Sequence, residues 1–496
     1  MNVSNVTSSL DQKLTDSSWL KIVAAVIALA HLYLNSFSSL SDLWASLLHF
    51  GLMGLLVSFA LAEKKASGGQ FGKLPKFFLG GIILFASLYL IMSEDAFYNR
   101  GQNFNKWDWT FSILAVVGAL ELARRTTGWV IPILAVLALT YATFWGRFVT
   151  GVFHFPGLTW ETMLYRATYG GDGMFGTIAR ISWTYVFMFI LFGTMLLKSG
   201  ASDMILGLAR RAAARFVGGP GLVAVFSSGL MGSVSGSAIG NTVSTGVVTI
   251  PLMRQSGFPA RTAAGIEAAS STGGQLMPPV MGAGAFLMAA YTGENYMTII
   301  GVAALPALLY FLSVAFQVRC VALRLGLNTN LSKHEDTEFS QDWPVLIPIA
   351  ILVGLLITGF TPTWSAGMAS VACIICARFG RRPMGLKDVI DGLAQASVTA
   401  APIAVLLIAV GLVIMAVTTT GLGPTVSQMI INWSGGSLVL TLILVALASL
   451  ILGLGLPVTA AYVVLAPLAA PALADLILQA KLIEALMGEH SMKVPA

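Results

Sequence analysis

The sequence predicts an all-α polytopic membrane protein, an inverted repeat with two re-entrant hairpins and about 11 full spans. The 496 residues are 56% hydrophobic and only 10% charged, whereas soluble domains have roughly 25% charged residues. Apolar runs of about 20 residues, the length that crosses a bilayer, recur along the chain. Glycine, serine and proline interrupt two longer apolar stretches near their midpoints. Such interruptions at membrane depth are typical of secondary transporters.

The expected full spans follow the apolar runs. They cover residues 20–35, 40–62, 77–92, 107–123, 129–147, 181–198, 263–290, 297–316, 343–359, 364–377 and 398–418. Two further apolar stretches, 219–252 and 437–475, are too long for one span, and we expect them to form re-entrant hairpins. Helix breakers free backbone groups that lipid cannot satisfy, so these groups must be buried in protein or line a cavity.

Basic residues lie in alternate loops between the expected spans. They are Lys64, Lys65, Lys73, Lys76, Arg124, Arg125, Lys198, Arg210, Arg211, Arg215, Arg254, Arg261, Arg319, Arg324, Lys333, Arg378, Arg381, Arg382 and Lys387. The loops between them are mixed or acidic. The positive-inside rule therefore predicts that the basic loops and the N-terminus are cytoplasmic. The net charge of +6 then reflects topology, and we expect no nucleic-acid partner.

A weak internal repeat relates the two hairpins. In the first unit, the span 181–198 precedes a basic helix at 203–217 and a hairpin tip that starts at Gly232. In the second, the span 398–418 precedes an amphipathic stretch at 424–434 and a tip that starts at Gly453, an offset of 221 residues. The expected number of spans orients the two units oppositely, which predicts an inverted-topology repeat.

The first hairpin tip, GSVSGSAIGN, concentrates hydroxyl and amide groups beside glycines. Such oxygens next to exposed backbone carbonyls suit a weakly held cation such as Na⁺. The candidate binding residues are Ser233, Ser235, Gly236, Ser237 and Asn241. Close packing of helices through small residues is the alternative interpretation.

The segment SSTGGQLMPP that ends at Pro279 predicts an unwound stretch opposite this tip. Proline removes an amide donor and clashes with the preceding turn, so a helix cannot continue through it. The candidates here are Ser271, Thr272, Gly273, Gly274, Met277, Pro278 and Pro279. Glu267 is an isolated carboxylate in an otherwise apolar helix. It either binds an ion or substrate, or makes a structural hydrogen bond to the hairpin.

The second tip contributes Gly453, Gly455, Pro457 and Thr459 as candidates. This tip has fewer hydroxyls, so its assignment depends on its position in the repeat. An intramembrane serine protease would need a histidine or lysine base beside its serine, and residues 219–290 contain neither. We therefore expect no enzymatic activity and no cofactor other than a coupling ion.

These motifs resemble the large membrane subunit of tripartite ATP-independent periplasmic (TRAP) transporters. The resemblance rests on GSVSGSA with Asn241, on EAASSTGGQLMPPVMGAGAFLMA, and on GLGLPVTAAYVVLAPLAAPAL, and covers most of residues 165–475. It is greatest to the TAXI branch, in which the small and large subunits are fused. It implies a small-subunit-like domain with a connecting helix at 1–150 and a large-subunit-like transport domain at 151–496.

The resemblance also implies how the protein works. Members of the family use a Na⁺ gradient and a secreted periplasmic substrate-binding protein, here of the TAXI type. They import small organic acids across the inner membrane by an elevator-like displacement. The positions of this chain that match the family's ion ligands at the first site are Ser233, Ser235, Asn241, Gly273, Gly274 and Pro278.

The family pattern places a second broken helix, with its own pair of prolines, after the second hairpin. The repeat offset puts that pair just beyond Ala496. We therefore expect the C-terminal part of the transport domain to be missing, through truncation or because another polypeptide supplies it. The alternative functions are a binding-protein-independent Na⁺/carboxylate carrier with similar hairpins, and a truncated fragment that does not transport.

Overall fold

The computed structural model describes residues 18–62, 74–327, 343–380, 383–454 and 458–479. All regular secondary structure in this part of the chain is helical, as the sequence predicts. The helices form two compact units. Unit 1 contains residues 41–180 and the chain from Pro402 onward, and unit 2 contains residues 181–401 together with the N-terminal helix.

Unit 1 begins with a packed helix pair, α3 (Asp42–Ala62) and α4 (Leu74–Asn99). The pair can approach closely because Gly80 has no side chain: a Cβ there would lie 2.7 Å from the Cβ of Ser58. The unit continues with α5 (Lys106–Thr127), α6 (Val130–Thr143), α7 (Trp160–Thr168) and α8 (Thr177–Ile181). It ends with α20 (Leu422–Trp433), α21 (Leu438–Gly453) and α22 (Val458–Gln479), of which α20 and α21 both pack against α22.

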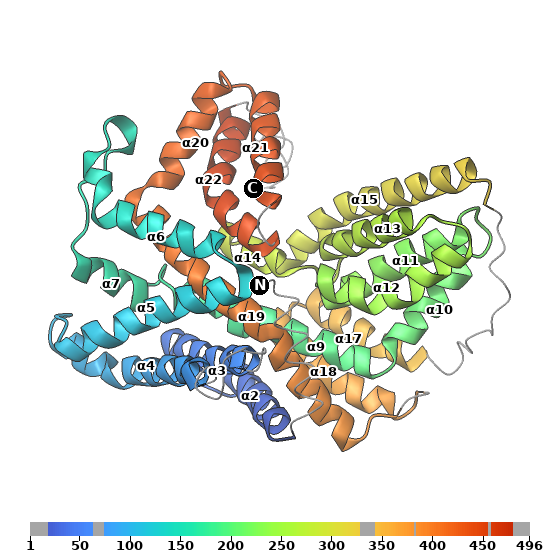
Figure 1. Ribbon diagram of the computed structural model, residues 1–496, viewed down its shortest axis with the longest axis horizontal. Helices are drawn as coiled ribbons and strands as arrows, with labels where there is room; N and C mark the ends of the chain where they lie inside the picture. Colours follow the sequence, from blue (N-terminus) through green and yellow to red (C-terminus); the bar gives the residue numbers. More distant parts are fainter. Residues whose placement is uncertain (1–17, 63–73, 328–342, 381–382, 455–457, 480–496) are drawn as a thin grey trace, which may run out of the picture. The chain divides into compact units, whose positions relative to one another are not determined.

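Unit 2 contains the first hairpin and the segment expected to be unwound. Its helices are α2 (Ser18–Ser36), a π-helical turn (Ser182–Val186), α9 (Phe187–Lys198), α10 (Ala201–Ala213), α11 (Gly219–Ser235), α12 (Ala238–Gln255), α13 (Ala260–Gly273), α14 (Ala283–Thr292), α15 (Tyr296–Arg324), α17 (Leu346–Ile357) and α18 (Pro362–Ala377). Helices α11, α12, α13 and α15 lie side by side (Figure 1). Helix α19 (Leu386–Thr420) begins in unit 2 and continues into unit 1.

Six helices among the described residues are long and apolar enough to cross a membrane. They are Ser18–Ser36, Asp42–Phe59, Phe78–Asn99, Thr177–Lys198, Tyr296–Arg324 and Leu386–Thr420. Shorter apolar helices cover Val130–Thr143, Trp343–Ile357, Pro362–Ala377, Leu438–Gly453 and Val464–Ile477. These helices are consistent with a polytopic membrane protein. The number of spans, the re-entrant character of the hairpins and the domain boundary at residue 150 stay predictions.

Candidate functional site

The first hairpin turns at Gly236. Helix α11 ends at Ser235, and Gly236 adopts a left-handed conformation with φ of 61°, which glycine tolerates at no steric cost. The Ser237 side chain then caps α12 by accepting a hydrogen bond from the Gly240 amide at 3.1 Å. A Cβ on Gly236 would lie 2.1 Å from the Met281 carbonyl oxygen. The turn therefore requires glycine both for its conformation and for contact with the segment opposite.

That opposite segment leaves the helical conformation after α13. One 3₁₀ turn, Gly274–Leu276, follows the helix, and Met277 is extended. The Gly282 amide donates to the Gln275 carbonyl at 2.8 Å, which closes the loop before α14 begins. The Tyr296 hydroxyl lies 2.9 Å from the Pro279 carbonyl oxygen and 2.7 Å from that of Val280. Buried backbone carbonyls need hydrogen-bond donors. A side chain from α15 thus provides a donor to carbonyls that the break leaves without a helical partner.

The hairpin and the break are in direct backbone contact. A Cβ on Gly232 would lie 2.2 Å from the Gly274 Cα, and a Cβ on Gly274 would lie 2.7 Å from the Gly232 Cα. The Val280 amide donates to the Ser233 carbonyl at 3.0 Å. Two glycines thus allow α11 and the end of α13 to touch without intervening side chains. The structure brings together the two segments that the sequence singled out.

Asn241 lies fully buried beside this contact. Its Nδ2 donates to the Ser228 carbonyl at 2.7 Å. Its Oδ1 is also buried and has no hydrogen-bond partner among the described residues. A buried acceptor without a donor is costly and needs an explanation. An oxygen in this position suits a hard cation, which takes oxygen ligands.

Glu267 lies at the centre of a buried polar cluster. The carboxylate accepts hydrogen bonds from one hydroxyl of α11, two of α12 and one of its own helix: Ser228, Thr245, Thr249 and Ser271. All five side chains are fully buried. The structural hydrogen bond that the sequence left open is therefore present, and it links α13 to both arms of the hairpin. Ion or substrate binding by Glu267 stays a prediction.

The remaining candidates lie in different surroundings. The Ser233 hydroxyl donates to the Leu230 carbonyl at 2.7 Å, and Ser235 lies at the turn itself. Thr272 is exposed and its hydroxyl donates to the Ala268 carbonyl of its own helix at 2.7 Å, away from the polar cluster. Met277, Pro278 and Pro279 form the partly buried wall of the break.

The second tip is described only in part. Gly453 is the last residue of α21, and a Cβ there would meet no atom within 4 Å. Gly455 and Pro457 lie outside the described residues, and Thr459 is described only as part of the α22 backbone. The predicted second site therefore stays a prediction.

Sequence reasoning missed three residues that complete the first site. Thr245 and Thr249 follow Asn241 at intervals of four residues, so all three lie on one face of α12, and all are buried. This periodicity was a usable signal. Ser228 offered no comparable signal, because it reaches the site only through the packing of α11 on α12 and α13. Among the described residues, no group of three or more His, Cys, Asp or Glu side chains could hold a metal ion.

Comparison with known proteins identifies the family. Residues 114–485 match the family model described as the tripartite ATP-independent periplasmic transporter, DctM component. The chain belongs to this TRAP transporter family. The resemblance to the TRAP large subunit is thus confirmed, and with the apolar helices it identifies a multi-pass membrane transport protein.

The matches to individual relatives cover different lengths of this chain. The C4-dicarboxylate TRAP transporter large permease protein DctM of Rhodobacter capsulatus is 28% identical over 298 residues, which are 56% of this chain and 63% of the relative. The sialic acid TRAP transporter permease protein SiaT of Haemophilus influenzae is 23% identical over 368 residues, 72% of this chain and 56% of the relative. A putative TRAP transporter large permease of Haemophilus influenzae is 25% identical over 287 residues, 57% of this chain and 67% of the relative. The chain thus spans about two thirds or less of the length of these relatives.

Proposed function

We propose that this chain is the membrane permease component of a Na⁺-coupled, binding-protein-dependent transporter that imports organic acids. The family supports transport, and relatives are named for sialic acid and for C4-dicarboxylates. The proposal includes a fused TAXI-type architecture, a TAXI-type periplasmic binding protein and an elevator-like movement of the transport domain. The motifs that resemble that branch support these finer assignments.

The buried, unpartnered Oδ1 of Asn241 is the observation that carries the ion assignment. It lies where the hairpin meets the break, since a Cβ on Gly274 would lie 3.0 Å from the Asn241 Nδ2. Backbone and hydroxyl oxygens without a dedicated acidic cage fit a monovalent cation that must bind and leave in each cycle. We assign the Na⁺ site to Ser233, Ser235, Asn241, Gly273, Gly274 and Pro278.

Charge balance limits the coupling. One elementary charge that crosses a potential of 100 mV changes in free energy by about 2.3 kcal/mol. A dianion that moves with two Na⁺ ions is electroneutral and gains nothing from the potential. Uptake of a dianion driven by the membrane potential therefore needs at least three Na⁺ ions.

Transport by the complete assembly tests this proposal. Proteoliposomes that contain the permease should accumulate a labelled organic acid only with an inward Na⁺ gradient and a cognate binding protein. Uptake with Na⁺ but without any binding protein would favour the binding-protein-independent carrier. Equal uptake with a choline gradient would refute Na⁺ coupling.

Substitution of Asn241 tests the ion site directly. We expect Asn241→Ala to lower the apparent Na⁺ affinity at least about tenfold, or about 1.4 kcal/mol, because the unpartnered oxygen is lost. The difference in melting temperature between Na⁺ and choline measures this affinity, since an ion that binds only the folded state stabilises it. Ser235→Ala should act in the same direction.

Thr242→Ala is the matched control, because Thr242 adjoins Asn241 but its hydroxyl donates to the Ala238 carbonyl of its own helix. This variant should keep the wild-type difference between Na⁺ and choline. A wild-type Na⁺ response in Asn241→Ala would show that the ion binds elsewhere.

The orientation is a further proposal, and thiol labelling tests it. We replace Cys320, Cys373 and Cys376 with alanine and place single cysteines at the exposed positions Gln255, Gly385 and Thr292. The first two should react with an impermeant reagent in intact cells at least about tenfold more slowly than the third, because basic loops stay in the cytoplasm. Rapid labelling at Gln255 would reverse the predicted topology.

A further inference from the structure

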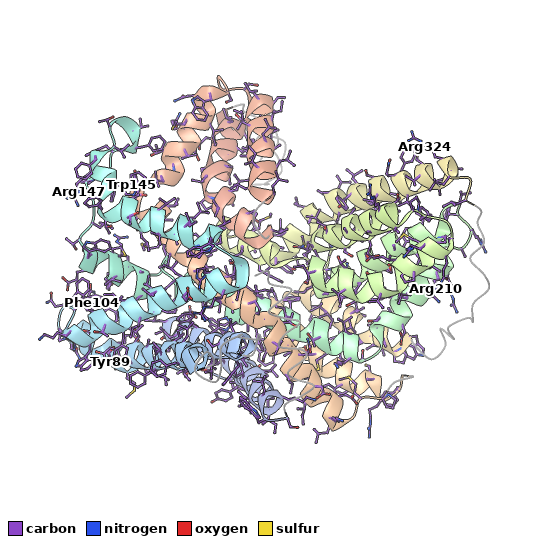
Figure 2. The ribbon with its side chains drawn as sticks, in the orientation of Figure 1. Tyr89, Phe104, Trp145, Arg147, Arg210 and Arg324 are labelled. Atoms are coloured by element: carbon purple, nitrogen blue, oxygen red, sulfur yellow. The ribbon has the colours of Figure 1, made fainter. Side chains whose placement is uncertain are left out.

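Seven arginines gather at one end of the helix group in unit 2. They are Arg210 and Arg211 at the end of α10, Arg215 just after it, Arg254 on α12, Arg261 on α13, and Arg319 and Arg324 on α15. We call this surface the basic end. The underlying chain segments touch: a Cβ on Gly218 would lie 2.7 Å from the Ala322 Cβ, and one on Gly257 would lie 2.8 Å from the Leu327 Cδ2. Figure 2 shows Arg210 and Arg324 at the same end of this helix group.

Few carboxylates lie on the described helices that carry the basic end. Within the helices α10 to α13 and α15, the only carboxylates are Asp203, in the first turn of α10, and Glu267, which is fully buried. In the described part of the chain, Arg254, Arg261 and Arg324 are exposed and form no ion pair. Two basic residues of unit 1 behave differently, because Arg124 and Arg125 both pair with Glu121 at 2.6 Å. These three exposed arginines therefore present positive charge that another molecule can neutralise.

Exposed apolar side chains lie among these arginines. Phe216 follows Arg215 and is 46% exposed, and Leu323 and Leu325 flank Arg324 and are 58% and 43% exposed. The surface is also continuous with α15, which is apolar enough to cross a membrane and is mostly not buried by the rest of the protein. Arginine forms bidentate hydrogen bonds to phosphate, and neighbouring apolar side chains insert at the boundary of the acyl chains.

We propose that the basic end binds the headgroups of anionic phospholipids. The exposed arginines Arg254, Arg261 and Arg324 fit the phosphate charge, and the apolar residues beside the arginines fit the interface of a bilayer better than a free anion. In the predicted orientation these lipids belong to the cytoplasmic leaflet, whose anionic surface attracts clusters of basic residues. Binding of these lipids stabilises the folded protein, whichever solute the protein transports.

Titration with phosphatidylglycerol tests this proposal. The purified full chain in mixed micelles of detergent and phosphatidylcholine should gain thermal stability as phosphatidylglycerol is added. The triple variant Arg215→Gln/Arg261→Gln/Arg324→Gln should need at least about tenfold more phosphatidylglycerol for the same gain. High salt should weaken the response of the wild type, because exposed charges are screened.

The triple variant Arg124→Gln/Arg125→Gln/Arg378→Gln is the matched control, because it removes the same charge elsewhere on the same predicted side. This control variant should respond to phosphatidylglycerol like the wild type. If it needs as much additional phosphatidylglycerol as the basic-end variant, the effect depends only on net charge and the proposal is wrong. The proposal is also wrong if the basic-end variant responds to phosphatidylglycerol like the wild type. It is likewise wrong if inorganic phosphate, added to micelles that contain phosphatidylcholine but no phosphatidylglycerol, stabilises the protein as much as phosphatidylglycerol does. If the triple variant does not fold, Arg324→Gln alone should show roughly a fivefold loss, and an unchanged titration would count against the proposal.

Discussion

Glu267→Ala should destabilise the folded protein by about 3–5 kcal/mol. The substitution leaves a cavity and removes the acceptor of four buried hydroxyl groups. Thr245 and Thr249 can turn to backbone carbonyls at 2.8 and 3.0 Å, but Ser228 and Ser271 lose their carboxylate partner. The cost should appear as a lower free energy of unfolding in a denaturant titration in detergent micelles.

Glu267→Gln separates the structural role of this residue from an ionic one. Glutamine keeps the volume and one acceptor oxygen, and Thr249 can accept from its amide while donating to the Thr245 carbonyl. If Glu267 only links α13 to the hairpin through hydrogen bonds, we expect the free energy of unfolding to fall by about 1 kcal/mol. The stabilisation by Na⁺ should then stay unchanged. Selective loss of the Na⁺ response in this variant would show that the carboxylate is an ion ligand.

Thr272→Ala is the control for both substitutions, because Thr272 is on α13 but exposed. Its hydroxyl bonds only within its own helix, so its loss should change the free energy of unfolding by less than about 0.5 kcal/mol. A wild-type stability of Glu267→Ala would contradict the interpretation of the buried cluster as the link between three helices.

The helices could be predicted from sequence because each depends on local composition. Apolar runs of span length predicted α2, α3, α4 and α15, and the glycines and prolines of 273–279 predicted where a helix must stop. The boundaries were less accurate. Helix α19 begins at Leu386, well before the expected span at 398, because Asp388 accepts a hydrogen bond from the Gly385 amide at 2.9 Å and starts the helix in a polar segment.

The contacts of the site were harder to predict because they join residues far apart in the sequence. Tyr310 donates to the Ala269 carbonyl at 2.9 Å, and its ring lies against Gly273. Nothing near either residue in the sequence indicates that contact. The same holds for Tyr296, which bonds the carbonyls of the break. Sequence reasoning found the segments that lose their helical hydrogen bonds, and only the packed structure shows which side chains replace them.

Gly274→Ala should abolish the close contact between the hairpin and the break. The φ of Gly274 is −56°, which alanine adopts readily, so the penalty is steric. The new Cβ would lie 2.7 Å from the Gly232 Cα and 3.0 Å from the Asn241 Nδ2. The first of these atoms belongs to the backbone and cannot rotate away, so the hairpin must move from the break.

We therefore expect Gly274→Ala to lower the free energy of unfolding by about 1–3 kcal/mol, to remove the stabilisation by Na⁺, and to reduce Na⁺-driven uptake at least about tenfold. Gly265→Ala is the matched control, because it lies on α13 with no atom within 4 Å of the new Cβ. That variant should gain up to about 1 kcal/mol from higher helix propensity and keep the Na⁺ response. If Gly274→Ala keeps both uptake and the Na⁺ response, the glycine contact is only a packing feature, and the ion site must be sought away from the hairpin tip.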